Sequence, residues 1–191
     1  MYKSPVMLAA VVGWSLLAVT SRAQNTDVYP LAPATILEIL ETNTGTVIIK
    51  AISPIGSMSV NAVNVSVTCK EDTDTSTRRK EYGIAISMEA TGQLEDRTIV
   101  DYDEMDSLLK AIDYLNKIDW SVTPLTSFNA AYATKGGFRI AAFSSRRSGA
   151  IEFSLRSGRM SKGLLLTQSQ LAQFRGLIDE AKRKLDEIRK K

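Results

Sequence analysis

The feature that most constrains this chain is an order of elements that occurs twice, a series of strand patterns followed by one amphipathic helix. The first four strand patterns lie at 46–52, 63–69, 82–88 and 97–100, and a helical pattern follows at 103–117. A second series lies at 128–133, 138–144, 150–156 and 159–166, before a helical pattern over 171–188. Each connection between strands is short enough to join antiparallel neighbours. The sequence therefore predicts an α+β fold of two antiparallel β-β-β-β-α units, in which one helix backs each meander.

The strands are recognised by alternation and by turn residues. Apolar Val63, Val65, Val67 and Cys69 alternate with polar neighbours, which is typical of a strand with one face on a core. The run 46–52 is rich in β-branched residues, and 53–56, which contains Pro54, indicates a turn directly after it. The polar run 70–80 is expected to be a hairpin loop.

The helices are recognised by a change of period. In 103–117, apolar residues recur every three or four positions, which places them on one side of a helix. Before the last helix, Thr167 and Gln170 match a capping box, in which each side chain satisfies a free backbone N–H. Both helices must bury an apolar stripe against a sheet or against another helix.

The N-terminus has the pattern of an export signal. One lysine precedes fourteen uncharged residues from Val6 to Val19, and small side chains near Ala23 suit cleavage after that residue. The sequence predicts a signal peptide at 1–23 and a periplasmic or extracellular protein; an N-terminal anchor or a buried helix is the alternative. The segment 24–45 is expected to be an extended leader, with a short helix or strand over 35–41. Residues 46–191 are expected to form one domain of two similar halves, 46–119 and 126–191.

Composition excludes several mechanisms. The chain of 191 residues has no histidine and one cysteine, Cys69, so it cannot form a Ser-His-Asp or Cys-His relay or a zinc site of cysteine and histidine. Cys69 lies in an alternating strand pattern and is expected to be a small buried residue. Asp72 and Asp74 alternate as oxygen ligands do, but the glycine and terminal glutamate of an EF-hand loop are missing. The sequence predicts no cofactor and no metal site.

Charge divides unevenly along the chain. The stretch from Asp27 to Asp119 has a net charge of −8, whereas Trp120 to Lys191 has +9. Two explanations are open: the halves attract each other within the molecule, or the basic half binds an anionic partner. Acidic residues also gather before and into the first helix, where negative charge suits the helix dipole; they are Glu95, Asp96, Asp101, Asp103, Glu104 and Asp106.

A candidate anion site follows from the basic half. Its basic residues are interleaved with Phe138, Phe143 and Phe153, and guanidinium groups bind phosphate or sulfate oxygens while exposed aromatic rings stack on bases. The alternative is that Phe153 is core and the arginines are a solvated face. The seven candidates are Lys135, Arg139, Arg146, Arg147, Arg156, Arg159 and Lys162.

The element order resembles that of the Whirly and purine-rich-element-binding (PUR) families, which are built from two β-β-β-β-α units. The junction 163–171, where a strand passes through a capped start into the last helix, is similar to the corresponding junction in single-strand-binding coactivators of that fold. The resemblance implies a fold in which a helix backs each sheet, and binding of nucleic acid.

Three functional hypotheses follow. The first is an exported, non-enzymatic domain that binds a partner, such as another exported protein, through its sheets or loops. The second is binding of a polyanion or single-stranded nucleic acid by the basic face of the second half. The third is an enzyme that uses two carboxylates, which sequence spacing alone does not test.

Overall fold

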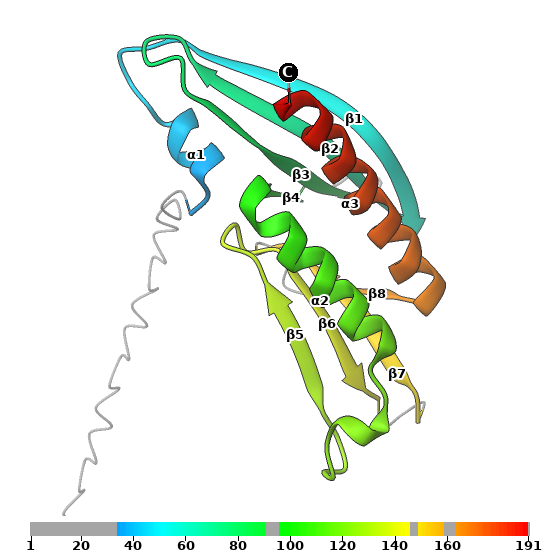
Figure 1. Cartoon of the computed structure of the whole chain (residues 1–191). Coiled ribbons are helices and arrows are strands. Elements are labelled where there is room, and N and C mark those ends of the chain that lie inside the picture. The colour runs from blue at the N-terminus through cyan, green and yellow to red at the C-terminus, as the bar shows by residue number, and fades with distance from the viewer. Residues whose placement is uncertain (1–33, 91–95, 146–148, 159–162, 191) are drawn as a thin grey trace, which may run out of the picture. The chain divides into compact units, whose positions relative to one another are not determined.

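Two four-stranded antiparallel sheets form the β part of the molecule (Figure 1). The computed structural model describes residues 34–90, 96–145, 149–158 and 163–190. The predicted signal peptide at 1–23 and the leader up to residue 33 lie outside the described residues. The segment 31–191 is one compact unit with its own core.

Sheet 1 has the strand order β1-β2-β3-β4. The strands are β1 (Ile48–Val60), β2 (Val63–Asp74), β3 (Lys80–Ala90) and β4 (Asp96–Asp101). Asn61 and Ala62 join β1 to β2 with φ of 48° and 66°. Two successive positive φ values are the geometry of a type I′ hairpin turn, which suits the twist of the two strands.

Two predictions about sheet 1 are wrong. The predicted turn at 53–56 lies inside β1, where the register with β2 shifts between Pro54 and Gly56. A proline is tolerated there because β1 is an edge strand, so its missing N–H breaks no ladder. The predicted loop at 70–80 is largely strand, and only 75–79 lies between β2 and β3. Charged residues continue the ladder because they pair across it, as Lys80 does with Glu71 at 2.8 Å.

Sheet 2 has the strand order β5-β6-β7-β8. Its strands are β5 (Asn129–Ala133), β6 (Arg139–Ser144), β7 (Ile151–Arg156) and β8 (Leu164–Leu166). The first three agree with the sequence prediction to within one residue at each end. The strand predicted at 159–166 is described only from residue 163, and β8 is short.

Three α-helices complete the structure: α1 (Ile36–Glu41), α2 (Met105–Lys117) and α3 (Gln168–Arg189). Short 3-10 turns, η1 (Tyr102–Glu104) and η2 (Trp120–Val122), flank α2. The capping box of Thr167 and Gln170 is confirmed at the start of α3, and Thr35 and Glu38 form a second one on α1. The open choice between helix and strand over 35–41 is thereby resolved as helix.

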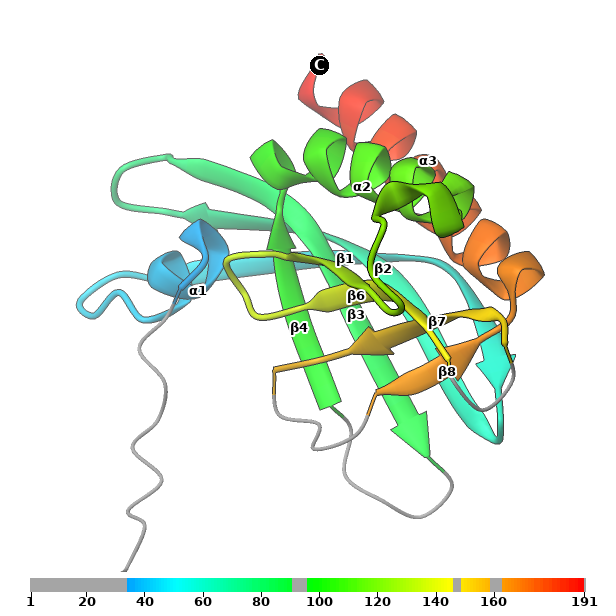
Figure 2. The same ribbon diagram turned by 90° about the horizontal axis from the view of Figure 1, so that it is seen from below.

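The helices are exchanged between the sheets. Helix α2, which follows sheet 1, packs on β5 and β6 of sheet 2, while α3, which follows sheet 2, lies mainly on β1 and β2. The two helices contact each other, and Figure 2 shows them side by side on one side of the sheets. One hydrophobic core therefore includes both sheets and both helices, and Phe138, just before β6, packs against Phe174 of α3 at 5.6 Å between ring centroids.

The predicted α+β class with two four-stranded meanders is confirmed. Cys69 is buried as predicted, and its thiol donates to the carbonyl oxygen of Ala181 at 3.5 Å. Burial raises the pKa of this thiol to about 11, so it stays protonated at neutral pH. Within the described ranges, no helix is both long and apolar enough to cross a membrane.

Candidate functional site

Sheet 2 has one buried face and one open face. Ile140, Ala142, Phe153 and Leu155 belong to the core that α2 and α3 cover. Because side chains alternate along a strand, their neighbours point to the opposite face, called here the outer face of sheet 2. Its register rows across β5, β6 and β7 contain Asn129, Ala131, Ala133, Arg139, Ala141, Phe143, Glu152, Ser154 and Arg156.

Two arginines lie directly opposite each other on this face. Arg139 of β6 and Arg156 of β7 are register partners, and each is at least partly exposed. Within the part of the chain that the structure describes, neither guanidinium has an ion pair. Like charges placed directly opposite on a sheet destabilise it, so this pair is a local concentration of positive charge that has no ion pair with any described carboxylate.

The other predicted site residues do not all join this pair. Lys135, in the β5–β6 turn, forms an ion pair with Asp103 at 2.9 Å, and its backbone N–H donates to Glu104. Of the interleaved aromatic residues, Phe138 and Phe153 are buried in the core, and Phe143 is on the outer face. The remaining four candidates lie outside the described residues: Arg146, Arg147, Arg159 and Lys162.

One basic residue outside the predicted set, Arg97, lies at the junction of the two sheets, where β4 of sheet 1 meets the end of β7 of sheet 2. It precedes Thr98 of β4, whose hydroxyl lies 2.6 Å from that of Ser157, the residue after Arg156. Both hydroxyls are buried. Because successive side chains alternate between the two faces of a strand, Arg97 points to the outer face of sheet 1 and Arg156 to the outer face of sheet 2. Arg97 is the only basic residue between Lys80 and Lys110 in the sequence. A search for clusters of basic residues therefore does not find it.

The outer face of sheet 1, which is turned away from α3, is different because α1 covers part of it. Leu37 of α1 packs on Ala85 and Ile99. The carboxylate of Asp101, at the end of β4, accepts hydrogen bonds from the backbone N–H groups of Ile36 and Leu37 at 2.7 and 3.3 Å. Helix α1 is thus fixed by a small apolar cluster and by a buried cap.

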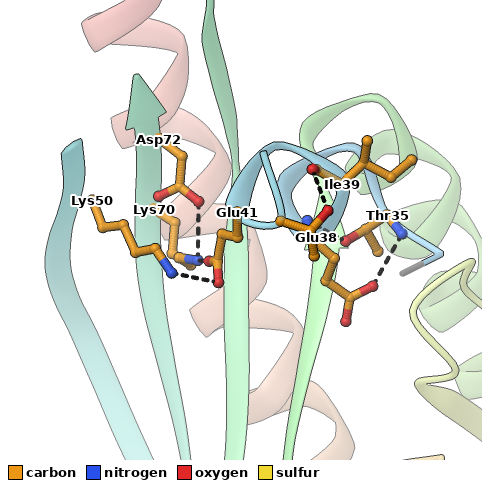
Figure 3. A network of polar contacts seen from close by, with 8 residues as sticks. Thr35, Glu38, Ile39, Glu41, Lys50, Lys70 and Asp72 are labelled. Atoms are coloured by element: carbon orange, nitrogen blue, oxygen red, sulfur yellow. Dashed lines mark hydrogen bonds and ion pairs between the residues drawn. The ribbon is translucent and has the colours of Figure 1, made fainter. Parts of the chain in front are cut away.

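A buried ionic cluster lies beside α1 (Figure 3). Lys70 of β2 contacts both Glu41 at the end of α1 and Asp72, whose oxygen is 3.3 Å away; Lys50 of β1 reaches Glu41 at 2.7 Å. Lys70 and Asp72 are almost completely buried. Burial raises the pKa of Glu41, but the hydrogen bonds from Lys50 and Lys70 outweigh it and bring the value to about 2. For Asp72, burial is the larger effect and raises the pKa.

The two aspartates that the sequence offered as metal ligands, Asp72 and Asp74, have partners within the chain. Asp74 accepts hydrogen bonds from Thr46 and Ser76, which hold the pKa of its carboxyl well below the usual range. Asp72 faces Lys70, as described above. Among the described residues, no three carboxylate or thiol side chains are placed to hold a metal ion.

A cavity of about 190 Å³ near the end of α3 has several carboxylates in its lining. Three carboxylates, Glu81, Asp101 and Asp103, line it together with Tyr102 and Arg189. Glu81 forms an ion pair with Arg79 at 2.7 Å. Asp101 already caps α1, and Asp103 already pairs with Lys135. The guanidinium of Arg189 lies 3.8 Å from the ring centre of Tyr102. These hydrogen bonds and ion pairs give the carboxylates a structural role.

Comparisons with known proteins add no family. No family model matches the chain, and no curated protein matches it.

Proposed function

We propose that this protein is a binding module that holds an extended polyanion, of the class of single-stranded nucleic acid, on the outer face of sheet 2. The observation that carries the proposal is the register pair of Arg139 and Arg156. An anion between the two guanidinium groups would offset their repulsion and accept hydrogen bonds from both, which is the geometry that binds phosphate strongly.

The rest of the face suits an extended chain. Ala131, Ala141 and Ser154 form a register row of small side chains beside the arginine pair, and on β8 the same row ends in Leu165, a large exposed side chain. Phe143 lies four residues from Arg139 on the same face, about 13 Å along the strand. An aromatic ring at this distance supports stacking of a base while the arginines hold phosphate groups.

The charge distribution and the predicted resemblance to Whirly and PUR proteins support the same class of ligand. The basic half of the chain contains the arginine pair, and the acidic half contributes Arg97 at the sheet junction. That the protein is exported, and that it is not an enzyme, stay predictions. The proposal requires neither.

Fluorescence anisotropy tests the proposal. The protein is titrated into a labelled single-stranded oligonucleotide and, separately, into a labelled sulfated polysaccharide, at low and at physiological salt. We expect micromolar or tighter binding of the oligonucleotide that weakens with salt because counterions are released. Tighter binding of the polysaccharide would reassign the site to sulfated polymers.

A charge-matched pair of variants locates the site. Arg139→Ala combined with Arg156→Ala should weaken binding about tenfold or more, since both phosphate contacts are lost. Arg79→Ala combined with Arg183→Ala removes the same charge at exposed positions that have carboxylate partners. Equal losses in the two double variants, or no binding at low salt, would refute the proposed site.

A further inference from the structure

A second surface lies between α2 and β5 and is apolar. Four large side chains are exposed there: Tyr114 by 61%, Trp120 by 47%, Val122 by 42% and Leu125 by 72%. Tyr114 and Val122 line one shallow depression of about 260 Å³. We call these four residues the α2–β5 patch; such a group of exposed apolar side chains marks an interaction surface.

The segment that carries the patch has no charged residue from Trp120 to Thr134. Trp120 is held in place, because its ring meets that of Phe128 edge-on at 5.9 Å between centroids. Leu125 follows Pro124 and is the most exposed of the four side chains. The apolar side chains are therefore presented by a short turn and a loop.

Positive charge borders the patch. Lys110, Tyr114 and Lys117 are spaced four and three residues apart, which places them on one exposed face of α2. In the described ranges neither lysine has an ion pair. One carboxylate, Asp119, lines the same depression as Lys117; it accepts hydrogen bonds from the backbone and hydroxyl of Ser121, which lower its pKa and keep it negatively charged.

We propose that the α2–β5 patch binds the interface of a lipid bilayer that contains anionic headgroups. Trp and Tyr are amphipathic and favour the headgroup region, while Val122 and Leu125 supply apolar area to insert below it. Lys110 and Lys117 would contact anionic headgroups. A stable protein interface needs a well-packed area of about 800 Å² on each partner, whereas a few protruding side chains suit a fluid interface that adapts to them.

Tryptophan fluorescence and sedimentation with vesicles test this proposal. The chain is taken from residue 24, which retains the whole compact unit and leaves Trp120 as the only tryptophan. Vesicles are made of phosphatidylcholine alone or mixed with phosphatidylglycerol. We expect the protein to sediment with the anionic vesicles, the Trp120 emission to shift to the blue, and both effects to weaken with salt.

Variants separate insertion from general charge attraction. Leu125→Ser should weaken vesicle binding about tenfold, since one large side chain is no longer buried. Leu165→Ser is the matched control, because Leu165 is 49% exposed on β8. Lys110→Ala with Lys117→Ala should lose about tenfold on anionic vesicles and nothing on neutral ones.

The proposal is independent of the polyanion site, so the two can fail separately. Arg139→Ala with Arg156→Ala should leave vesicle binding unchanged, and loss in that variant while Leu125→Ser binds normally would overturn the assignment. No sedimentation with anionic vesicles at low salt would also overturn it. A Trp120 shift that grows with protein concentration without lipid, and no vesicle binding, would instead identify the patch as a contact between copies of the chain.

Discussion

The two sheets have the same strand architecture, but the basic side chains on their outer faces differ in burial and in ion pairing. On sheet 1, Lys70 is buried beside α1 and is neutralised by Glu41 and Asp72. On sheet 2, Arg139 and Arg156 face each other in the open without an ion pair among the described residues. On one face the charges hold a helix on the fold, and on the other the two guanidinium groups have no ion pair among the described residues, which is the basis of the proposed binding site.

This difference predicts that substitutions on the two faces will affect stability and binding in opposite ways. The covered face should respond to mutation as a structural element, because Lys70 and Asp72 are buried there and form an ion pair with each other. The open face should respond as a binding surface, with little effect on folding. Removing a cation from each face should therefore change stability by very different amounts.

The largest effect is expected from Lys70→Met. The substitution leaves Asp72 buried without a cation, and breaking one partner of a buried ion pair costs about 3–5 kcal/mol of unfolding free energy. Urea unfolding at pH 7 measures the loss. The loss should shrink as pH falls, because protonation of Asp72 removes the unpaired charge.

Lys50→Met is the control for this prediction. Lys50 contacts the same Glu41 but is half exposed, and an exposed ion pair contributes at most about 1 kcal/mol. If the two substitutions destabilise the protein equally, the buried cluster has no special structural role and the comparison between the faces fails.

The next effect concerns the pH dependence that Glu41 causes. Its pKa is about 2 in the folded protein against 4.5 for the ordinary group, so its contribution is complete above pH 4.5 and is lost as pH falls from 4.5 to 2. The contribution amounts to about 3 kcal/mol at most. Unfolding curves of wild type and Glu41→Gln should therefore converge over this pH range, and a constant difference between them would contradict the assignment.

Asp101→Ala should have a smaller and more local effect. The substitution removes the acceptor of the Ile36 and Leu37 N–H groups, which costs about 1–3 kcal/mol when such groups stay buried. We expect Leu37 and Leu40 to exchange their amide hydrogens faster, while amides in the core of sheet 2 keep their protection. Uniform loss of protection across both sheets would show that α1 is part of the global core.

The sequence was sufficient for the elements whose signals are local. Alternation located most strand interiors, and the Thr167–Gln170 capping box located the start of α3, because both depend on neighbouring residues. Strand ends were less predictable. The segment 70–74 is polar, but it continues β2, where Lys70 contacts Glu41 of α1, Asp72 contacts Lys70, and Asp74 accepts a hydrogen bond from Thr46.

Contacts between elements that are distant in sequence could not be predicted from local patterns. The exchange of α2 and α3 between the sheets depends on which faces fit together, and no local pattern specifies that fit. For the candidate site, the sequence prediction grouped Lys135 with the arginines because they are close in sequence. In the structure Lys135 forms an ion pair with Asp103, and Arg97 lies at the junction of the two sheets.

The smallest effect on folding is expected from Arg156→Gln, which tests the open face directly. The substitution removes one of two like charges that lie directly opposite, so the free energy of unfolding should stay constant or rise, by less than about 1 kcal/mol. Salt should reduce the difference, because it screens the repulsion in the wild type. A loss comparable to that of Lys70→Met would mean that Arg156 has a structural partner, and the open face would then resemble the covered one. Unchanged stability together with weaker oligonucleotide binding is the combination that only a binding surface produces.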